Sequence, residues 1–528
     1  MPPPADLDRL SHAELKDLVL QLLEKVSELQ RIVAAQRDEI ARLKGGSGRP
    51  NIKPSGMEQA TEPPLDRAGN PRRPRGSTRS KLLIDEEQII KLAASPSGSR
   101  FKGYTSFVVQ DLVMRPHVVE FRCERWQTPD GEMITAPLPA GFHGHFGPHL
   151  RRFVLALYHQ GQVTMLRLLS LLREFGILIS KRQIVRLLNE DKQGFLDEAR
   201  DVLRAGLSDA SWISVDDTGA RHKAQNGVCT QIGNDYFAWF GTTGVKNRLN
   251  FLELLRAGYT DYVINDAALA YMRRRKLAGP TIALLAAHVD KHFSDRMAWQ
   301  AHLDRLALVS LEVTRDPFQV ATEGAVWGSI KAHALLRDTV IVSDDAGQFA
   351  VSTHALCWVH AERLVHELDT FTEDQRSAQK RVRDQIWEFY RDLKIYRRDP
   401  SAQHKAKLGA RFDEIFQQQT GSVMLDRLLK RLHANRAELL LVLDRPEIPL
   451  HTNGSENDIR CHVTRRKISG GTRSDAGRDC RDAFLGLAKT CAKLRIAFWD
   501  YLGSRLEVPG NPMIPYLPEM IAAQLRPP

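Results

Sequence analysis

Three acidic residues that lie far apart in the sequence have the setting of metal-binding carboxylates. Asp216 ends the expected strand WISVD, Asp344 ends the expected strand TVIVSD, and Glu456 lies in NGSENDIR, near the start of a helix. Carboxylates at the ends of neighbouring strands meet at one edge of a sheet and suit Mg²⁺ or Mn²⁺. Two such ions, roughly 3.5–4 Å apart, can activate an attacking oxygen and stabilise the leaving oxygen of a phosphodiester. We therefore predict a metal-dependent site for phosphodiester chemistry.

Each of the three positions has an alternative. An Asp at a strand end often only caps a turn or the following helix. Asp217 and Asp345 are neighbours on the opposite faces of their strands, so either could replace the preceding residue as the ligand. Asp266 ends the earlier stretch DYVIND and competes with Asp344 for the second position.

The elements that must position these acids predict an α/β fold. SWISVDDTG, GVCTQIGND and YFAWFGTTG indicate three antiparallel strands, NRLNFLELLRAG indicates a helix, and further strands follow from residue 339. This order is typical of a ribonuclease-H-like fold, in which parallel strands follow an antiparallel meander. We expect a catalytic domain over 208–505, with helical insertions near 267–338 and 372–449, and a C-terminal tail over 506–528.

The N-terminal part is predicted to serve assembly. Within residues 1–45, β-branched residues recur every seven residues at Val19, Val26, Val33 and Ile40. The second apolar position of the heptad is a leucine in most of the repeats. This pattern favours a parallel two-stranded coiled coil, and an amphipathic helix packed on its own domain is the alternative. Residues 46–81 are rich in Gly, Pro, Ser and basic residues, so we expect a disordered linker.

Two further regions precede the expected catalytic domain. Residues 82–140 contain alternating apolar residues around the turn PDGE, which indicate a small β-rich region with a hairpin. Residues 141–207 are predicted to be helical, and two helices there are joined by GILIS in the manner of a helix-turn-helix. Many helical pairs share this form without binding DNA.

Charge and clusters of basic residues favour a polyanionic partner. The formal net charge of the 528 residues is +11, which favours nucleic acid without proving it. The alternative for each cluster is a solvated basic surface. The candidate DNA contacts are Arg72, Arg73 and Arg75 in the linker, Lys181 and Arg182 in the second helix of the pair, and Arg460, Arg465, Arg466 and Lys467 after Glu456.

Several classes of protein are disfavoured by the sequence. No apolar run approaches the roughly 20 residues that span a bilayer, and the N-terminus lacks the features of a signal peptide. The six cysteines form no CxxC pair, which argues against a Cys₄ zinc ribbon and fits a reducing cytosol. We expect a cytoplasmic protein without a membrane partner.

The acids and their neighbours resemble the DDE transposases of the bacterial insertion-sequence sixty-six type. In that family Asp-Glu-Thr ends the first strand, and DDT at 216–218 matches it. The second Asp precedes Cys-Trp-Ala-His, which CWVH at 357–360 matches, and this favours Asp344 over Asp266. The family's Glu motif, which is followed by an Arg-Lys pair, is matched by NGSENDIR at 453–460. The family's cysteine-rich zinc segment has no counterpart here.

The resemblance implies a transposase that binds transposon ends and catalyses DNA cleavage and strand transfer. It implies that Asp216, Asp344 and Glu456 are the catalytic metal ligands for two ions of Mg²⁺ or Mn²⁺. Double-stranded DNA, a second copy joined through the coiled coil and helper proteins of the same element would be the partners. The competing functions are a nuclease or resolvase without strand transfer, and a non-catalytic dimeric DNA-binding protein. His360 either positions a phosphate or water, or packs in the core.

Overall fold

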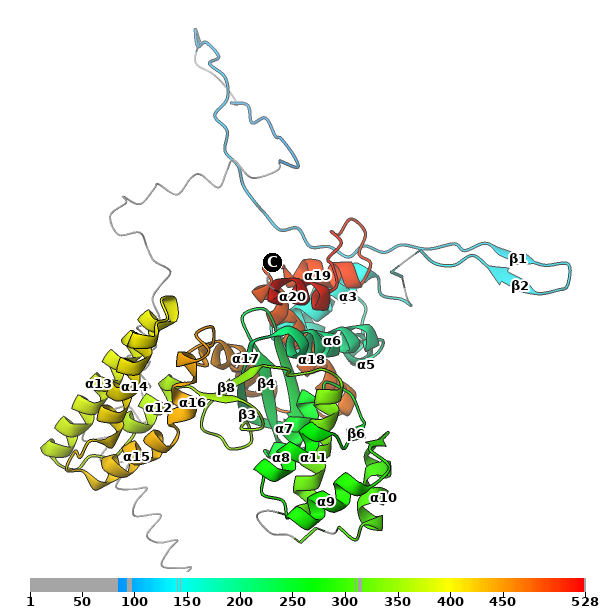
Figure 1. Ribbon diagram of the computed structural model, residues 1–528. Coiled ribbons are helices and arrows are strands. Elements are labelled where there is room, and N and C mark those ends of the chain that lie inside the picture. The colour runs from blue at the N-terminus through cyan, green and yellow to red at the C-terminus, as the bar shows by residue number, and fades with distance from the viewer. Residues whose placement is uncertain are drawn as a thin grey trace, which may run out of the picture. The chain divides into compact units, whose positions relative to one another are not determined.

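A five-stranded mixed sheet lies at the centre of the computed structural model (Figure 1), which describes residues 84–92, 97–139, 141–142, 144–308, 310–311 and 316–526. Contacts divide the chain into residues Met1–Gly69 and Asn70–Pro528, and every described residue belongs to the second unit. The predicted coiled coil and the linker arginines Arg72, Arg73 and Arg75 lie outside the described residues, so both stay predictions.

The strands of the sheet occur in the predicted order. The antiparallel strands are β3 (Trp212–His222), β4 (Gln225–Gly233) and β5 (Ala238–Thr243). β8 (Val340–Ser343) runs parallel to β3, and β9 (His354–Leu356) runs parallel to β8. The spatial order is β5-β4-β3-β8-β9. The predicted α/β class is therefore confirmed, with β3 in the middle of the sheet.

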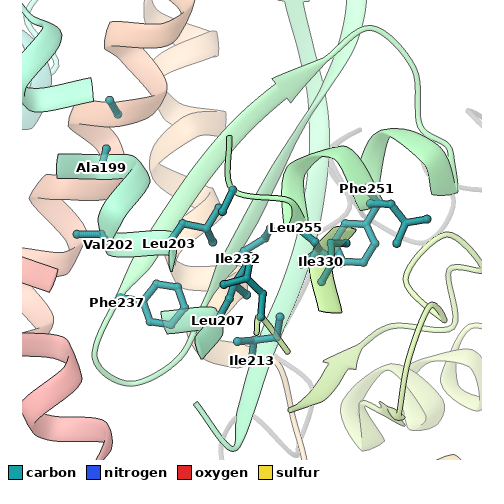
Figure 2. Packing of buried hydrophobic residues seen from close by; sticks show 14 of the residues in the cluster. Ala199, Val202, Leu203, Leu207, Ile213, Ile232, Phe237, Phe251, Leu255 and Ile330 are labelled. Carbon is teal, nitrogen blue, oxygen red and sulfur yellow. The ribbon is translucent and has the colours of Figure 1, made fainter. Parts of the chain in front are cut away.

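The core on one side of the sheet explains why β3 is fixed in place. Apolar side chains of α6 (Gln193–Asp209), including Leu203 and Leu207, pack with Ile213 and Ile232 from the strands (Figure 2). A Cβ atom at Gly206 of α6 would lie 2.3 Å from the ring of Phe237. Only glycine therefore lets this helix approach the sheet so closely.

The stretch between the antiparallel strands and β8 is mostly helical. It contains α7 (Arg248–Leu255), α8 (Asp266–Arg274), α9 (Gly279–Ala287), α10 (Arg296–Arg305) and α11 (Pro317–Ala332). The expected strand in DYVIND is β6 (Tyr262–Val263), which pairs with β7 (His292–Phe293) in a separate two-stranded sheet. DYVIND thus does not contribute a strand to the central sheet.

A second helical stretch follows β9. Its elements are α12 (Trp358–His366), α13 (Glu373–Arg398), α14 (Ala402–Gln417), α15 (Val423–Ala434), α16 (Arg436–Leu439) and the 3₁₀ turn η4 (Leu441–Leu443). Here α13 contacts α14, and α14 contacts α15, so these helices lie side by side (Figure 1).

Four helices complete the chain after this stretch. They are α17 (Asn453–Ser469), α18 (Asp475–Lys493), α19 (Phe498–Arg505) and α20 (Leu517–Leu525). α17 contacts β3 and β4, and α18 contacts β5 and α6. Helices that precede the sheet in sequence (α6) and helices that follow it (α17 and α18) thus pack on it. Within the described residues, no helix combines the length and the apolar content that crossing a bilayer requires.

The elements before the sheet match the expected hairpin and helical pair. β1 (Arg125–Gln127) and β2 (Met133–Thr135) form a hairpin around PDGE. The helices are α3 (Pro148–Leu155), the π-helix η3 (Ala156–Gln160), α4 (Met165–Glu174) and α5 (Lys181–Asn189). α4 contacts α5, and a capping box of Ser180 and Gln183 begins α5. DNA binding by this pair remains a prediction.

Candidate active site

Asp216 and Asp344 follow matched positions of two parallel strands. The printed register pairs Ser214 of β3 with Val342 of β8. Continuing this register by two residues places Asp216 beside Asp344, which lies directly after β8. Both side chains are half-buried. The two acids, 128 residues apart in sequence (344 − 216), are thus neighbours at one edge of the sheet.

Glu456 reaches the same edge from the first turn of α17. Its backbone N–H donates to the carbonyl of Thr452 at 3.0 Å, which begins the helix. The hydroxyls of Ser455 and Ser214 share a buried hydrogen bond. Because each serine lies within two residues of an acid, this bond fixes the start of α17 against β3 beside Asp216.

The competing acids have other partners or another place. Asp217 accepts hydrogen bonds from Lys246 Nζ at 2.9 Å and from Gln348 Nε2 at 2.9 Å, contacts that no sequence pattern indicated. Asp345 is exposed and faces Arg431 Nη2 at 3.5 Å. Asp266 is exposed in the first turn of α8, away from any strand of the central sheet. Geometry therefore favours Asp216 and Asp344 over these neighbours.

The pKa of Asp216 shows that the other two acids lie close enough to act on it. Burial raises the pKa of Asp216 to about 6, a hydrogen bond from the backbone N–H of Asp217 opposes the rise, and the carboxylates of Glu456 and Asp344 add to it. The donating N–H lies 2.7 Å from Asp216 Oδ1. A carboxyl group whose pKa is raised by burial and by two neighbouring carboxylates lies at a place that suits a cation.

Glu456 is surrounded by basic side chains that do not bind it closely. His360 Nε2 lies 3.7 Å from Glu456 Oε1, Arg363 Nη2 lies 4.0 Å from the same oxygen, and Arg460 Nη2 lies 3.9 Å from Oε2. Glu456 Oε1 is buried and has no hydrogen-bond partner. A buried carboxylate oxygen without a partner is costly unless something else binds it, and a divalent cation meets that need.

The CWVH segment explains how His360 comes to lie beside Glu456. The backbone N–H of Cys357 donates to the carbonyl of Ser343 at 2.9 Å, directly before Asp344. Trp358 Nε1 donates to the carbonyl of Leu439 at 3.0 Å, and its buried ring packs against aromatic residues of α13 and α14. Cysteine and tryptophan thus fix the start of α12, and His360 projects one turn later.

His360 is not a histidine isolated in an apolar core. Burial alone would lower the pKa of His360, but the hydrogen bond with Cys357 and the carboxylate of Glu456 raise it. A protonated imidazole at this place partly balances the negative charge of the three acids. His360 therefore contributes to the electrostatic surroundings of the site and is not only a packed core residue.

The predicted DNA contacts fall into two groups. Lys181, Arg182, Arg460 and Lys467 are exposed. Arg465, by contrast, is 5% exposed and donates to the carbonyl of Tyr158 at 2.8 Å. Its guanidinium also stacks on the ring of Tyr158, with Cζ 3.9 Å from the ring centroid. Its contacts join α17 to η3, so Arg465 is occupied by the protein interior.

Arg466 and the segment after α17 are attached to the end of β3. Arg466 Nη1 donates to the carbonyl of Gly219. Thr472 donates to the Arg221 carbonyl at 3.0 Å and accepts from the N–H of Lys223 at 2.8 Å. A Cβ atom at Gly471 would lie 2.3 Å from the Arg221 carbonyl oxygen. This glycine therefore serves close approach to β3.

The spacing of the acids bears on the number of cations. Across the described residues, the three-residue group whose possible ligand atoms all lie within 4.8 Å of one another is Cys229, His462 and Asp482. The carboxylates of Asp216, Asp344 and Glu456 are therefore more widely spread. Three carboxylates at this spacing do not form a single compact set of ligands, and two-metal sites for phosphodiester chemistry are likewise spread over several carboxylates.

Comparison with known proteins supports a role in transposition. Residues 331–479 match the family model described as "Transposase IS66 family". This match includes Asp344, CWVH and Glu456 and begins after Asp216. The chain is also 49% identical over 324 residues to "Uncharacterized protein y4jO" of Sinorhizobium fredii (strain NBRC 101917 / NGR234), and the matched part covers 61% of this chain and 100% of the relative. The chain belongs to the IS66 family of transposases.

Proposed function

We propose that this transposase cleaves and joins DNA with Asp216, Asp344 and Glu456 on a ribonuclease-H-like core. The observation that carries the proposal is the meeting of these acids from β3, β8 and α17 at one sheet edge, where Glu456 and Asp344 raise the pKa of Asp216. Three antiparallel strands followed by parallel strands support the assignment of the core.

The three carboxylates of Asp216, Asp344 and Glu456 would hold two cations. Mg²⁺ or Mn²⁺ would supply an activated oxygen nucleophile and stabilise the leaving oxygen of the phosphodiester. Glu456 Oε1 has no hydrogen-bond partner, and the pKa of Asp216 is raised. Both properties are expected of carboxylates that bind a cation. Water would attack first at a transposon end, and the freed 3′-hydroxyl would then attack target DNA.

Other residues would position the DNA rather than react with it. His360 and Arg363 lie beside Glu456 and can neutralise a phosphate that approaches the acids. Arg460 and Lys467 are exposed on the same helix as Glu456 and can contact the backbone of the duplex. Lys181 and Arg182 at the start of α5 would contact the transposon ends, where a helix-turn-helix inserts its second helix.

The parts outside the described residues complete the proposal. A coiled coil over 1–45 would join two copies, the basic linker over 46–81 would lie along phosphates, and helper proteins of the element would assist. Joining two copies would bring two active sites to the two ends of one element.

The first prediction tests the acids. Changing Glu456→Gln or Asp216→Asn should lower DNA cleavage and strand transfer by more than about 100-fold, because even indirect changes around a metal site cost 10–100-fold. Cleavage and joining are measured with DNA that carries the element's own ends, in cells that contain the whole element. Asp266→Asn and Asp345→Asn are matched controls and should retain activity.

Pre-cleaved ends with a free 3′-hydroxyl separate the competing functions. Joining of such ends to a target plasmid supports a transposase, whereas cleavage without joining supports a nuclease or resolvase. If the Glu456→Gln and Asp216→Asn proteins bind DNA and transpose at normal rates, the acids do not carry the chemistry.

A further inference from the structure

A second group of possible ligands lies apart from the three acids. Cys229 of β4, His462 of α17 and Asp482 of α18 place one ligand atom each within 4.8 Å of the other two. Their residues are 0%, 1% and 5% exposed, respectively. Three different elements thus direct a thiol, an imidazole and a carboxylate into one enclosed place.

One of these ligand groups has an unmet bonding need. Nδ1 of His462 is buried and has no hydrogen-bond partner. A buried imidazole nitrogen normally has a donor or an acceptor, because burying it unpaired costs free energy. Ile459, Phe240 and Leu485 form the apolar cluster around Cys229, and they offer no such partner.

The carboxylate of Asp482 is held in a defined orientation. Arg481 donates to Asp482 Oδ1 from Nε at 2.9 Å and lies 2.8 Å from the same oxygen through Nη2. Arg481 Nη2 also donates to Thr242 Oγ1 at 2.7 Å. Both contacts between Arg481 and Asp482 use Oδ1, so Oδ2 of Asp482 remains available to bind a metal ion. Carboxylates that bind metals are commonly oriented by hydrogen bonds of this kind.

We propose that Cys229, His462 and Asp482 form a structural zinc site. Sulfur, nitrogen and oxygen ligands together suit Zn²⁺, with bonds of about 2.3, 2.0–2.1 and 2.0–2.2 Å. Cys229 binds as the thiolate, and its proton passes to solvent when the ion enters. A water molecule completes four-coordination. Arg481 stays outside the ligand set and balances the extra negative charge.

The ion would fasten the C-terminal helices to the sheet. It joins β4, next to β3, to both α17 and α18. His462 lies six residues after Glu456 on α17 (462 − 456), so it fixes the helix that presents Glu456. This proposal does not depend on the role of the three acids, since it concerns a different set of side chains.

The experiment measures metal content in the full-length chain. Protein made in zinc-containing medium is dialysed without chelator, and zinc per chain is measured by mass spectrometry. We expect one zinc per chain in the unchanged protein and its loss in Cys229→Ser. Cys491→Ser is the matched control, because Cys491 is also 0% exposed but belongs to no such cluster. This control should retain the zinc.

Two further arms make the result decisive. The double variant Asp216→Asn, Glu456→Gln should retain zinc; zinc lost there and kept in Cys229→Ser would assign the metal to the acids and overturn the proposal. Cobalt(II) loaded into the unchanged chain should give a thiolate-to-metal charge-transfer band. A chain that retains no zinc, or binds cobalt without that band, also overturns the proposal, whether or not the Cys229 variant folds.

Discussion

Asp216 has an unusual environment for a carboxyl group. Burial, Glu456 and Asp344 all favour its protonated form, whereas the N–H of Asp217 and, more weakly, His360 favour the charged form. The folded state therefore binds a proton at Asp216 more tightly than the unfolded state does. The free energy of unfolding should therefore depend on pH through Asp216.

Without divalent cations, the stability contributed by Asp216 should fall as pH rises. Its folded pKa of about 6 lies above the ordinary 3.8, so the contribution is complete below about pH 4 and is lost as pH rises through about 6. As pH rises between these values, the free energy of unfolding of Asp216→Asn should therefore increase by roughly 1–3 kcal/mol relative to that of the unchanged protein. Urea unfolding in chelator measures the difference. A difference that stays constant with pH would contradict the assignment, and added Mg²⁺ should reduce it.

At the scale of elements, α12 depends on a buried ion pair. Glu362 is 0% exposed on α12, and Arg383 Nε of α13 donates to its Oε1 at 2.7 Å. The long helix α13 thus supports α12, which carries His360. Removing one partner of a buried pair leaves an uncompensated charge, which is far costlier than the pair itself.

Arg383→Met should lower the free energy of unfolding by about 3–5 kcal/mol. Transposition should fall as well, because α12 places His360 beside Glu456. Arg376→Met is the matched control on the same helix, since Arg376 pairs with Glu373 at the surface; its effect should stay within about 0.5 kcal/mol. Equal effects of the two changes in urea unfolding would show that the pair does not support α12.

Some elements could be predicted from sequence because their patterns are local. Strands β3, β4, β5 and β8 follow from short β-rich runs between turns, and α7 follows from its periodicity. The buried side of α17 is different. It buries Ser455, Asp458, His462 and Arg465 beside Ile459. Apolar periodicity cannot identify such a polar interface, so burial of Arg465 could not be foreseen.

The two candidate sites differ in how far sequence could reveal them. Asp344 and Glu456 lie in recognisable segments, so their meeting with Asp216 could be expected. The partners of Asp217 could not, because Lys246 and Gln348 come from loops whose paths depend on the whole fold. The Cys229, His462 and Asp482 group has spacings of 233 and 20 residues (462 − 229 and 482 − 462), unlike any short metal motif.

At the scale of the whole molecule, charge should govern binding to DNA. The net charge of +11 attracts phosphates, whereas the three acids repel them where no cation is bound. In chelator, Asp216→Asn should bind end DNA as tightly as the unchanged protein or more tightly. Arg460→Ala and Lys467→Ala should each reduce the slope of log affinity against log salt by about 0.9. Fluorescence anisotropy measures both quantities, and slopes that neither change alters would remove these residues from the interface.

The attachments of α17 fix Glu456 relative to the strand that carries Asp216. The Ser214–Ser455 bond, the Arg466–Gly219 bond and the pairing of Thr472 with the end of β3 connect α17 and the segment after it to the strand of Asp216. Asp216 and Glu456 therefore form one stiff body. Asp344 lies in the loop after β8, outside regular structure. If the site binds cations as proposed, we expect this loop to take up any contraction, so the distance from Asp344 to Asp216 should change more than the distance from Glu456 to Asp216.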